Sequence, residues 1–217
     1  MRTRLGIDEA GRGCVLGPMV FGGLLVDEDR EPELKRLGAK DSKRLSKKRR
    51  EALREPLAAA SRGWKVVEIP AVDIDGASMG ILGKEAIVAL VDHFRPTVVV
   101  LDAPVPPRGI PAFVDDLQRR FAERDITVEV VAENKADDNH PCCSAASVFA
   151  KTARDARLAE LEALAGEPIG SGYPSDPKTQ AWLRGVYART GTFPPFVRTK
   201  WETVRRLVGD DGQGRLF

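Results

Sequence analysis

The sequence predicts an α/β protein, and three observations lead to this prediction. Short apolar runs rich in β-branched residues alternate along the chain with longer segments whose apolar residues recur at helical spacing. Hydrophobic residues make up 42% of the 217 positions, enough to bury a sizeable core. The sequence has no internal repeat and no linker long enough to divide it. We therefore expect one large domain over residues 1–208 and a flexible tail over 209–217.

Five segments have the pattern of strands. The first is short, partly β-branched and bounded by glycines. The fourth is continuously apolar, as in a central strand buried on both faces. Because the second strand follows the first after a loop, the two are expected to pair antiparallel. The expected strands are 2–7, 19–26, 64–70, 97–101 and 126–132.

The remaining regular segments have helical patterns. Ser46 can cap a helix that begins after it, and Pro141 suits the first turn of a long helix. Small residues near the start of that long helix, Ser144-Ala145-Ala146-Ser147, would permit close packing against a sheet. Residues 71–80 and 170–177 are expected to be loops. The expected helices are 46–60, 81–94, 110–124, 141–165, 177–189 and 199–208.

The composition excludes several classes of protein. The 34 lysines and arginines nearly balance 32 aspartates and glutamates, so any basic surface must be local. The densest basic run, 43–50, is most often a solvated helix face. Three cysteines cannot build a disulfide framework and lack zinc-ribbon spacing. No apolar stretch reaches the length of a membrane span and no signal peptide opens the chain, so we expect a cytoplasmic protein without membrane association.

Carboxylates stand where expected strands end. Asp8 and Glu9 follow the first strand, Asp102 follows the fourth, and the polar loop 133–141 contains three more. For residues 5–17 alone, a strand followed by an ordinary glycine-rich turn explains the pattern equally well.

Together, strand-end carboxylates would form a cluster of like charge, which is destabilising unless a cation sits in it. Without a histidine and cysteine ligand set, oxygen ligation favours Mg²⁺ or Mn²⁺ over zinc. Two such ions, about 4 Å apart, activate water and stabilise the leaving oxygen in phosphodiester hydrolysis. The residues therefore indicate metal-dependent phosphoryl transfer to water.

Six motifs then occur in a definite order over residues 5 to about 204. They are Asp8-Glu9-Ala10-Gly11-Arg12-Gly13, Lys40-Asp41-Ser42-Lys43, Asp102 after its apolar strand, Lys135-Ala136-Asp137, Ser144-Ala145-Ala146-Ser147 and Gly172-Tyr173-Pro174-Ser175-Asp176. In order and spacing they resemble the motifs of the ribonuclease HII family, and the short N-terminus is more like its archaeal type.

This resemblance implies an RNase H-like mixed five-stranded sheet flanked by helices, with a helical C-terminal part. It implies a set of catalytic, metal-binding carboxylates, Asp8, Glu9, Asp102 and Asp137, that holds Mg²⁺ or Mn²⁺. The adjacent Asp138 is a rival that the residues alone do not exclude, although the Lys-Ala-Asp register selects Asp137.

The resemblance also implies the activity and the substrate contacts. Such an enzyme hydrolyses RNA in RNA–DNA hybrids and cuts on the 5′ side of ribonucleotides embedded in duplex DNA, leaving a 3′-hydroxyl, by a two-metal-ion mechanism. The segment Gly11-Arg12-Gly13 matches the reader of the ribose, Lys43 a phosphate contact, and Tyr173 the aromatic that packs on the following deoxyribose. Lys135 and Arg198 would extend the duplex-binding face of what we expect to be a monomer.

The sequence departs from the family at three places. Cys142 and Cys143 stand where small aliphatic residues are common, and we expect them to pack as core residues. His140 stands where an aromatic is common, and the segment Gly80–Glu85 is atypical for the family.

The final residues, Gln213-Gly214-Arg215-Leu216-Phe217, resemble a truncated sliding-clamp-binding peptide. Gln213, Leu216 and Phe217 would be its anchors. So short a pattern also occurs by chance.

Two other classes of protein share part of the pattern. Sugar kinases and actin-like ATPases also have a first strand that ends in Gly-Ile-Asp, as residues 6–8 do here, but they need a second phosphate loop and an adenosine-binding glycine pair, which this sequence lacks. A non-catalytic nucleic-acid or clamp-binding adaptor would gain nothing from clustered acid facing phosphate.

Overall fold

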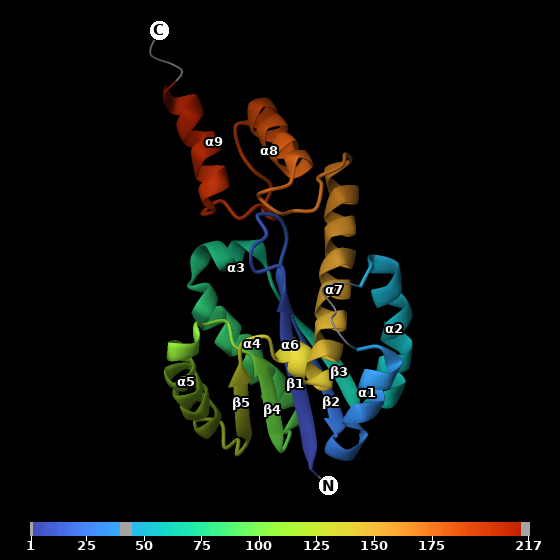
Figure 1. Cartoon of the computed structure of the whole chain (residues 1–217). Coiled ribbons are helices and arrows are strands. Elements are labelled where there is room, and N and C mark those ends of the chain that lie inside the picture. Colours follow the sequence, from blue (N-terminus) through green and yellow to red (C-terminus); the bar gives the residue numbers. More distant parts are fainter. Residues whose placement is uncertain (1, 40–44, 214–217) are drawn as a thin grey trace. The chain divides into compact units, whose positions relative to one another are not determined.

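The computed structural model describes residues 2–39 and 45–213 and contains a five-stranded sheet (Figure 1). The chain divides into two compact units. Unit 1 comprises Met1–Ala10, Val20–Glu68 and Gly83–Ala153, and unit 2 comprises Gly11–Met19, Ile69–Leu82 and Arg154–Phe217. Within the described ranges, no helix combines the length and apolar character needed to cross a bilayer.

The sheet has five strands in the order β3-β2-β1-β4-β5. β1 pairs antiparallel with β2, as expected, whereas β1 with β4 and β4 with β5 are parallel. The mixed sheet that the sequence predicts is therefore confirmed, with β1 in the middle. The bounds are β1 Thr3–Ala10, β2 Met19–Asp27, β3 Gly63–Ile69, β4 Val98–Asp102 and β5 Glu129–Glu133.

Strand burial follows the sequence pattern closely. The continuously apolar β4 is buried from Val98 to Leu101, as expected for a central strand. β1 is longer than expected, because its ladder with β2 continues to the pair Ala10↔Val20. Asp8 and Glu9 therefore belong to the last residues of the strand rather than to the loop after it.

Four helices were predicted before residue 166, and the structure contains all four as α2, α4, α5 and α7, which lie wholly or partly in unit 1. Ser46 caps α2 by accepting a hydrogen bond from the backbone amide of Arg49, at 3.3 Å. The helices that lie wholly or partly in unit 1 are α1 Glu31–Leu37, α2 Lys47–Ala60, α4 Met79–Phe94, α5 Ile110–Ala122, α6 Ala136–Asn139 and α7 Pro141–Ala165, with 3-10 turns at Glu28–Arg30 and Pro107–Gly109.

Unit 2 contains α3 Ala71–Gly76, α8 Pro177–Thr190 and α9 Glu202–Gln213. The prediction of a loop over 71–80 was wrong, because Pro70 starts a short helix that buries Ala71 and Ile74, one turn apart. The last helix begins three residues later than expected and continues to Gln213, into the expected tail.

Two glycines let α7 lie directly on the sheet of unit 1 (Figure 1). A Cβ at Gly6 of β1 would lie 2.2 Å from the carbonyl carbon of Cys142, and one at Gly22 of β2 would lie 2.4 Å from the carbonyl oxygen of Ala146. Helix and strands therefore meet backbone to backbone. The expected close packing of the small residues on α7 is confirmed.

Each unit has its own apolar core. Cys142 and Cys143 are fully buried, so their interpretation as core residues is confirmed. The Cys143 thiol donates to the carbonyl oxygen of Val100 at 3.1 Å. The buried cluster of unit 2 consists of Val15, Leu16, Ile169, Trp182, Leu183, Val186, Val197 and Val204.

Candidate active site

The carboxyl ends of β1 and β4 bring two predicted aspartates to one sheet edge. The parallel register pairs Ile7 with Leu101, so Asp8 and Asp102 follow at equivalent positions on adjacent strands. Because side chains alternate along a strand, equivalent positions in a parallel pair face the same side of the sheet. Sequence reasoning placed both residues at strand ends, and the register makes them neighbours.

Asp8 is a buried carboxylate, 7% exposed. It accepts hydrogen bonds from the Ser147 hydroxyl and from the backbone amide of Glu9. Lys151, one turn further along α7, donates from its ammonium to the Ser147 hydroxyl oxygen at 2.8 Å. Burial raises the pKa of Asp8 to about 6, and the negative charge of Asp137 adds to the rise, while the Ser147 hydrogen bond, the Lys151 charge and the Glu9 amide partly offset it.

The loop after β5 is tied back to the end of β4. The backbone amide of Lys135 donates to Oδ1 of Asp102 at 2.7 Å. The side-chain amide of Asn134 donates to the carbonyl oxygens of Ala103 and Val105, at 3.0 and 2.7 Å. Lys135 adopts a left-handed conformation with φ of 62°, which non-glycine residues rarely take up. These contacts hold the backbone of the loop in place just before Asp137 and Asp138.

The structure distinguishes the two rival aspartates of this loop. Asp137, on the short helix α6, is 2% exposed, whereas Asp138 faces solvent. The negative charge of Asp137 contributes to the raised pKa of Asp8. Asp137 is therefore the buried member of the pair and the one that the motif register favours.

Glu9 differs from the three aspartates. Strand alternation directs its side chain to the face of β1 opposite to that of Asp8, and it is half-buried. Across the described ranges, no three acidic, histidine or cysteine side chains are placed as a ready-made metal site. The donor chemistry nevertheless fits Mg²⁺ or Mn²⁺, because the buried Asp8 is an oxygen ligand that a cation would return to its ionised form.

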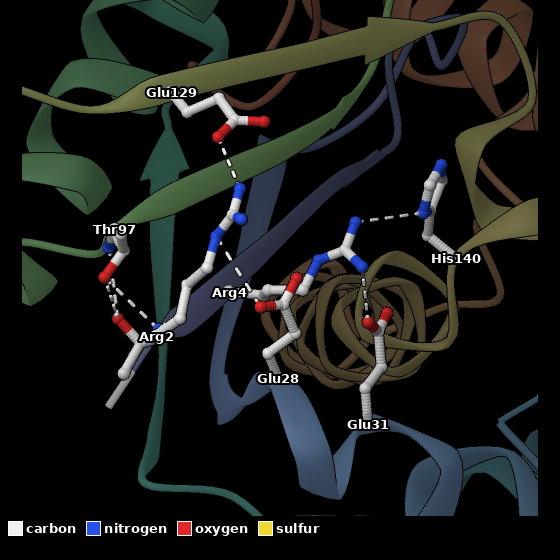
Figure 2. A network of polar contacts seen from close by, with 8 residues as sticks. Arg2, Arg4, Glu28, Glu31, Thr97, Glu129 and His140 are labelled. Atoms are coloured by element: carbon white, nitrogen blue, oxygen red, sulfur yellow. Dashed lines mark hydrogen bonds and ion pairs between the residues drawn. The ribbon is translucent and has the colours of Figure 1, made fainter.

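A polar network fixes the start of α7 against the opposite end of β1 (Figure 2). Arg4 forms a 3.0 Å ion pair with Glu31, which also accepts from the backbone amide of Cys142 at 3.1 Å. The other terminal nitrogen of Arg4 lies 3.4 Å from Nδ1 of His140, whose Nε2 lies 3.1 Å from Glu133. The network anchors the first turn of the helix that carries Ser147 and Lys151. Sequence reasoning missed it, although Arg4 shares the strand face of Asp8.

The residues predicted to read the ribose and to pack on the deoxyribose, Gly11-Arg12-Gly13 and Tyr173, belong to unit 2. We call residues 11–17 the Gly-Arg-Gly loop. The backbone amides of Val15 and Leu16 both donate to the carbonyl oxygen of Gly172, at 2.8 and 3.3 Å. This carbonyl belongs to the residue before Tyr173, so the loop and the aromatic predicted to pack on the sugar lie side by side.

Arg154 joins the same group of residues. Its guanidinium lies 5.1 Å from the centre of the Tyr173 ring and donates to the Cys14 sulfur at 3.2 Å. Tyr173 itself is 43% exposed, which leaves part of its ring accessible. No motif marks Arg154, because it is one of several charged residues on a long helix.

Two further expectations about charged residues had different outcomes. Lys43 lies outside the described residues. Arg198, expected on the duplex-binding face, has 0% exposure and is buried against the Gly-Arg-Gly loop. That expectation was wrong, because an arginine in a sequence gives no sign of whether it is buried among backbone carbonyls.

An aspartate-lined sheet edge on this mixed sheet defines an RNase H-like nuclease as the class of protein. The sequence model of the family described as Ribonuclease HII matches residues 5–204, so the chain belongs to the ribonuclease HII family. It is therefore a divalent-metal-dependent endoribonuclease that acts on RNA–DNA hybrids. Family membership excludes the kinase-like and adaptor alternatives.

Relatives and solved structures agree with this assignment. The ribonuclease HII of Thermococcus onnurineus is 40% identical over 212 residues, covering 93% of this chain and 88% of the relative. The crystal structure of ribonuclease H2 from Pyrococcus horikoshii matches with a TM-score of 0.85 at 36% identity, covering 96% of this chain and 98% of the other. The structure of the PCNA:RNase HII complex from Archaeoglobus fulgidus matches with a TM-score of 0.82 at 34% identity, covering 94% and 96%.

The raised pKa of Asp8 predicts a pH-dependent stability difference in metal-free protein. A carboxyl whose folded pKa exceeds its ordinary value of 3.8 contributes most below that value, and its contribution is lost as pH rises through about 6. Asp8→Asn should therefore raise the free energy of unfolding near pH 8 by up to about 3 kcal/mol, and the gain should vanish near pH 4. Denaturant titrations at both pH values with a chelator present measure this.

Asp138→Asn is the matched control, because it makes the same chemical change at an exposed carboxylate, and the Asp8→Asn difference is measured against it. An Asp8→Asn effect of equal size at both pH values would contradict the burial argument.

Proposed function

We propose that this enzyme hydrolyses the phosphodiester on the 5′ side of ribonucleotides, both in RNA–DNA hybrids and at single ribonucleotides embedded in duplex DNA, leaving a 3′-hydroxyl. The observation that carries the proposal is the parallel register of β1 and β4, which places Asp8 and Asp102 side by side. Asp137 is close enough to influence the charge of Asp8. Together they supply the anionic oxygens that phosphodiester hydrolysis by two metal ions requires.

In this proposal the acidic set Asp8, Glu9, Asp102 and Asp137 holds Mg²⁺ or Mn²⁺. Asp8, Asp102 and Asp137 supply the direct ligands, and Glu9, on the opposite face of β1, adds negative charge next to them. When bound, two ions would supply an activated water and stabilise the leaving 3′ oxygen. The protein's own contribution is to hold the carboxylates in place. Ser147 and Lys151 orient Asp8 from α7, and the backbone amide of Lys135 holds one oxygen of Asp102.

The Gly-Arg-Gly loop and Tyr173 would recognise the substrate. Gly11 is required by the fold itself, since its φ is +82° and a Cβ there would lie 2.8 Å from the carbonyl oxygen of Pro18. Gly13 is not, because a Cβ there would have no atom beyond its chain neighbours within 4 Å. An exposed glycine that the fold does not need supports close approach of a ligand, here the 2′-hydroxyl that distinguishes RNA. Lys43 would add a phosphate contact.

The decisive assay uses a duplex with one embedded ribonucleotide. Wild-type protein should cut it only when Mg²⁺ or Mn²⁺ is present, on the 5′ side of the ribonucleotide. Asp102→Asn should lower the cleavage rate by about 10²-fold or more, because it removes a ligand charge but little volume. Affinity for the duplex, measured by fluorescence anisotropy, should survive.

Asp138→Asn serves as the control and should cleave normally. Normal turnover by Asp102→Asn would overturn the metal assignment, and cleavage of an all-DNA duplex at equal rate would overturn the substrate assignment.

Gly13→Ala tests the ribose reader separately from the fold. The added methyl group meets nothing in the protein, so the melting temperature should stay within about 2 °C of wild type, whereas Gly11→Ala should lower it clearly. Gly13→Ala should nonetheless raise KM for the embedded ribonucleotide by roughly tenfold or more. Unchanged steady-state kinetics would contradict the proposed contact.

We also propose that the C-terminal residues bind a sliding clamp. The support is the spacing of Gln213, Leu216 and Phe217 and the similarity to the Archaeoglobus fulgidus enzyme, which was solved with PCNA. Leu216 and Phe217 lie outside the described residues. Removing residues 212–217 should abolish binding to the clamp in surface plasmon resonance and leave duplex cleavage without clamp unchanged. Undiminished clamp binding by the shortened chain would refute the proposal.

A further inference from the structure

The guanidinium of Arg198 holds the Gly-Arg-Gly loop from inside unit 2. Its Nε donates to the carbonyl oxygen of Gly17 and its Nη1 to that of Arg12, both at 3.0 Å. Backbone hydrogen bonds also join the two segments. The amide of Arg198 donates to the carbonyl oxygen of Val15 at 2.9 Å, and the amide of Gly17 donates to that of Phe196 at 2.8 Å. One side chain therefore spans two carbonyls that lie five residues apart in the loop.

Burying the Arg198 guanidinium in the core costs free energy, because it removes a charged group from water. Arg198 is completely buried, and burial lowers its pKa to about 10, so it stays charged near neutral pH. Within the described ranges no carboxylate lies within salt-bridge distance of its guanidinium, although the negative charge of Asp75 acts on it from further away. The guanidinium lies over the face of Trp201, 5.0 Å from the ring centre. A buried charge without a direct carboxylate partner is destabilising compared with an apolar side chain of similar size. The guanidinium thus calls for a role other than filling space.

Peptide geometry suggests that role. In a planar trans peptide the C=O and the following N–H point in opposite directions. Because the carbonyl of Arg12 is directed at the buried guanidinium, the N–H of Gly13 is directed away from it. Gly13 is exposed, and the space beside its Cα is open. The Gly13 amide is thereby presented outward as a hydrogen-bond donor.

We propose that Arg198 is a positioning residue that aims the Gly13 amide at the 2′-hydroxyl of the substrate ribonucleotide. The inference rests on the proposed ribose-reading role of the Gly-Arg-Gly loop and names the residue that enforces it. An arginine suits this task because its planar fork offers several donors in fixed directions, whereas lysine carries its donors on a single flexible ammonium. Arg198→Lys therefore keeps the positive charge but cannot donate to the carbonyl oxygens of Arg12 and Gly17 at the same time.

The test compares Arg198→Lys, Arg198→Met and the matched control Arg206→Met, which alters an exposed arginine of α9. Two quantities are measured with the full chain and a chelator present. One is the ratio of dissociation constants for an all-DNA duplex and the same duplex with one ribonucleotide. The other is hydrogen exchange of the peptide that covers residues 11–18, with the α8 peptide as the internal reference.

We expect the wild-type preference for the ribonucleotide duplex to fall about tenfold in Arg198→Lys, the equivalent of one well-aimed hydrogen bond, and at least as far in Arg198→Met. Exchange in residues 11–18 should rise while α8 stays protected, and Arg206→Met should match wild type. Global unfolding would raise exchange in both peptides alike. Arg198→Lys, which retains the buried charge, keeps the test valid if Arg198→Met does not fold.

Retention of the full preference by Arg198→Lys would overturn the positioning role, and so would unchanged exchange of residues 11–18. Absence of any preference in wild-type protein would instead refute ribose reading by the loop in the proposed function. The two failures are therefore distinguishable.

Discussion

The backbone-to-backbone contact of α7 with β1 and β2 is the constraint on which the rest of unit 1 depends. Glycines at 6 and 22 remove the side chains that would hold the helix off the sheet. At the resulting short separation, Ser147 reaches the carboxylate of Asp8 and Lys151 reaches Ser147. The same helix is fixed at its first turn by Glu31 and Arg4. Packing and chemistry thus share one helix face, and neither can be altered without the other.

The second organising feature is the burial of two ionisable side chains. Asp8 and Arg198 are both buried ionisable groups, one in each unit, and each is held by hydrogen bonds rather than by a direct ion pair. Buried charges of this kind are seldom retained for stability alone. In the proposals made above, Asp8 would bind a metal ion, and Arg198 holds the carbonyl groups of the Gly-Arg-Gly loop in place.

Much of this could be predicted from the sequence, and the rest depends on long-range contacts. The strand-end positions of Asp8 and Asp102 follow from apolar periodicity, and Asp137 follows from its motif. The helix α3 was missed because it has only six residues, preceded by Pro70 and ending at Gly76. The burial of Arg198 was missed because its acceptors are main-chain oxygens some 180 residues earlier, which no side-chain pattern marks.

The position of β1 in the sheet has a consequence for how the chain folds. The middle strand is formed by residues 3–10, yet its parallel neighbour begins at Val98 and the helix that covers it begins at Pro141. Pairings between such distant segments carry a large loop-closure entropy and slow folding. During synthesis β1 and β2 can pair early, but their glycine-lined face stays exposed until α7 has left the ribosome. The same face carries the apolar side chains of Leu24 and Val26, which pack with Cys142 and Ala146 of α7, so these side chains also stay uncovered until that helix is available.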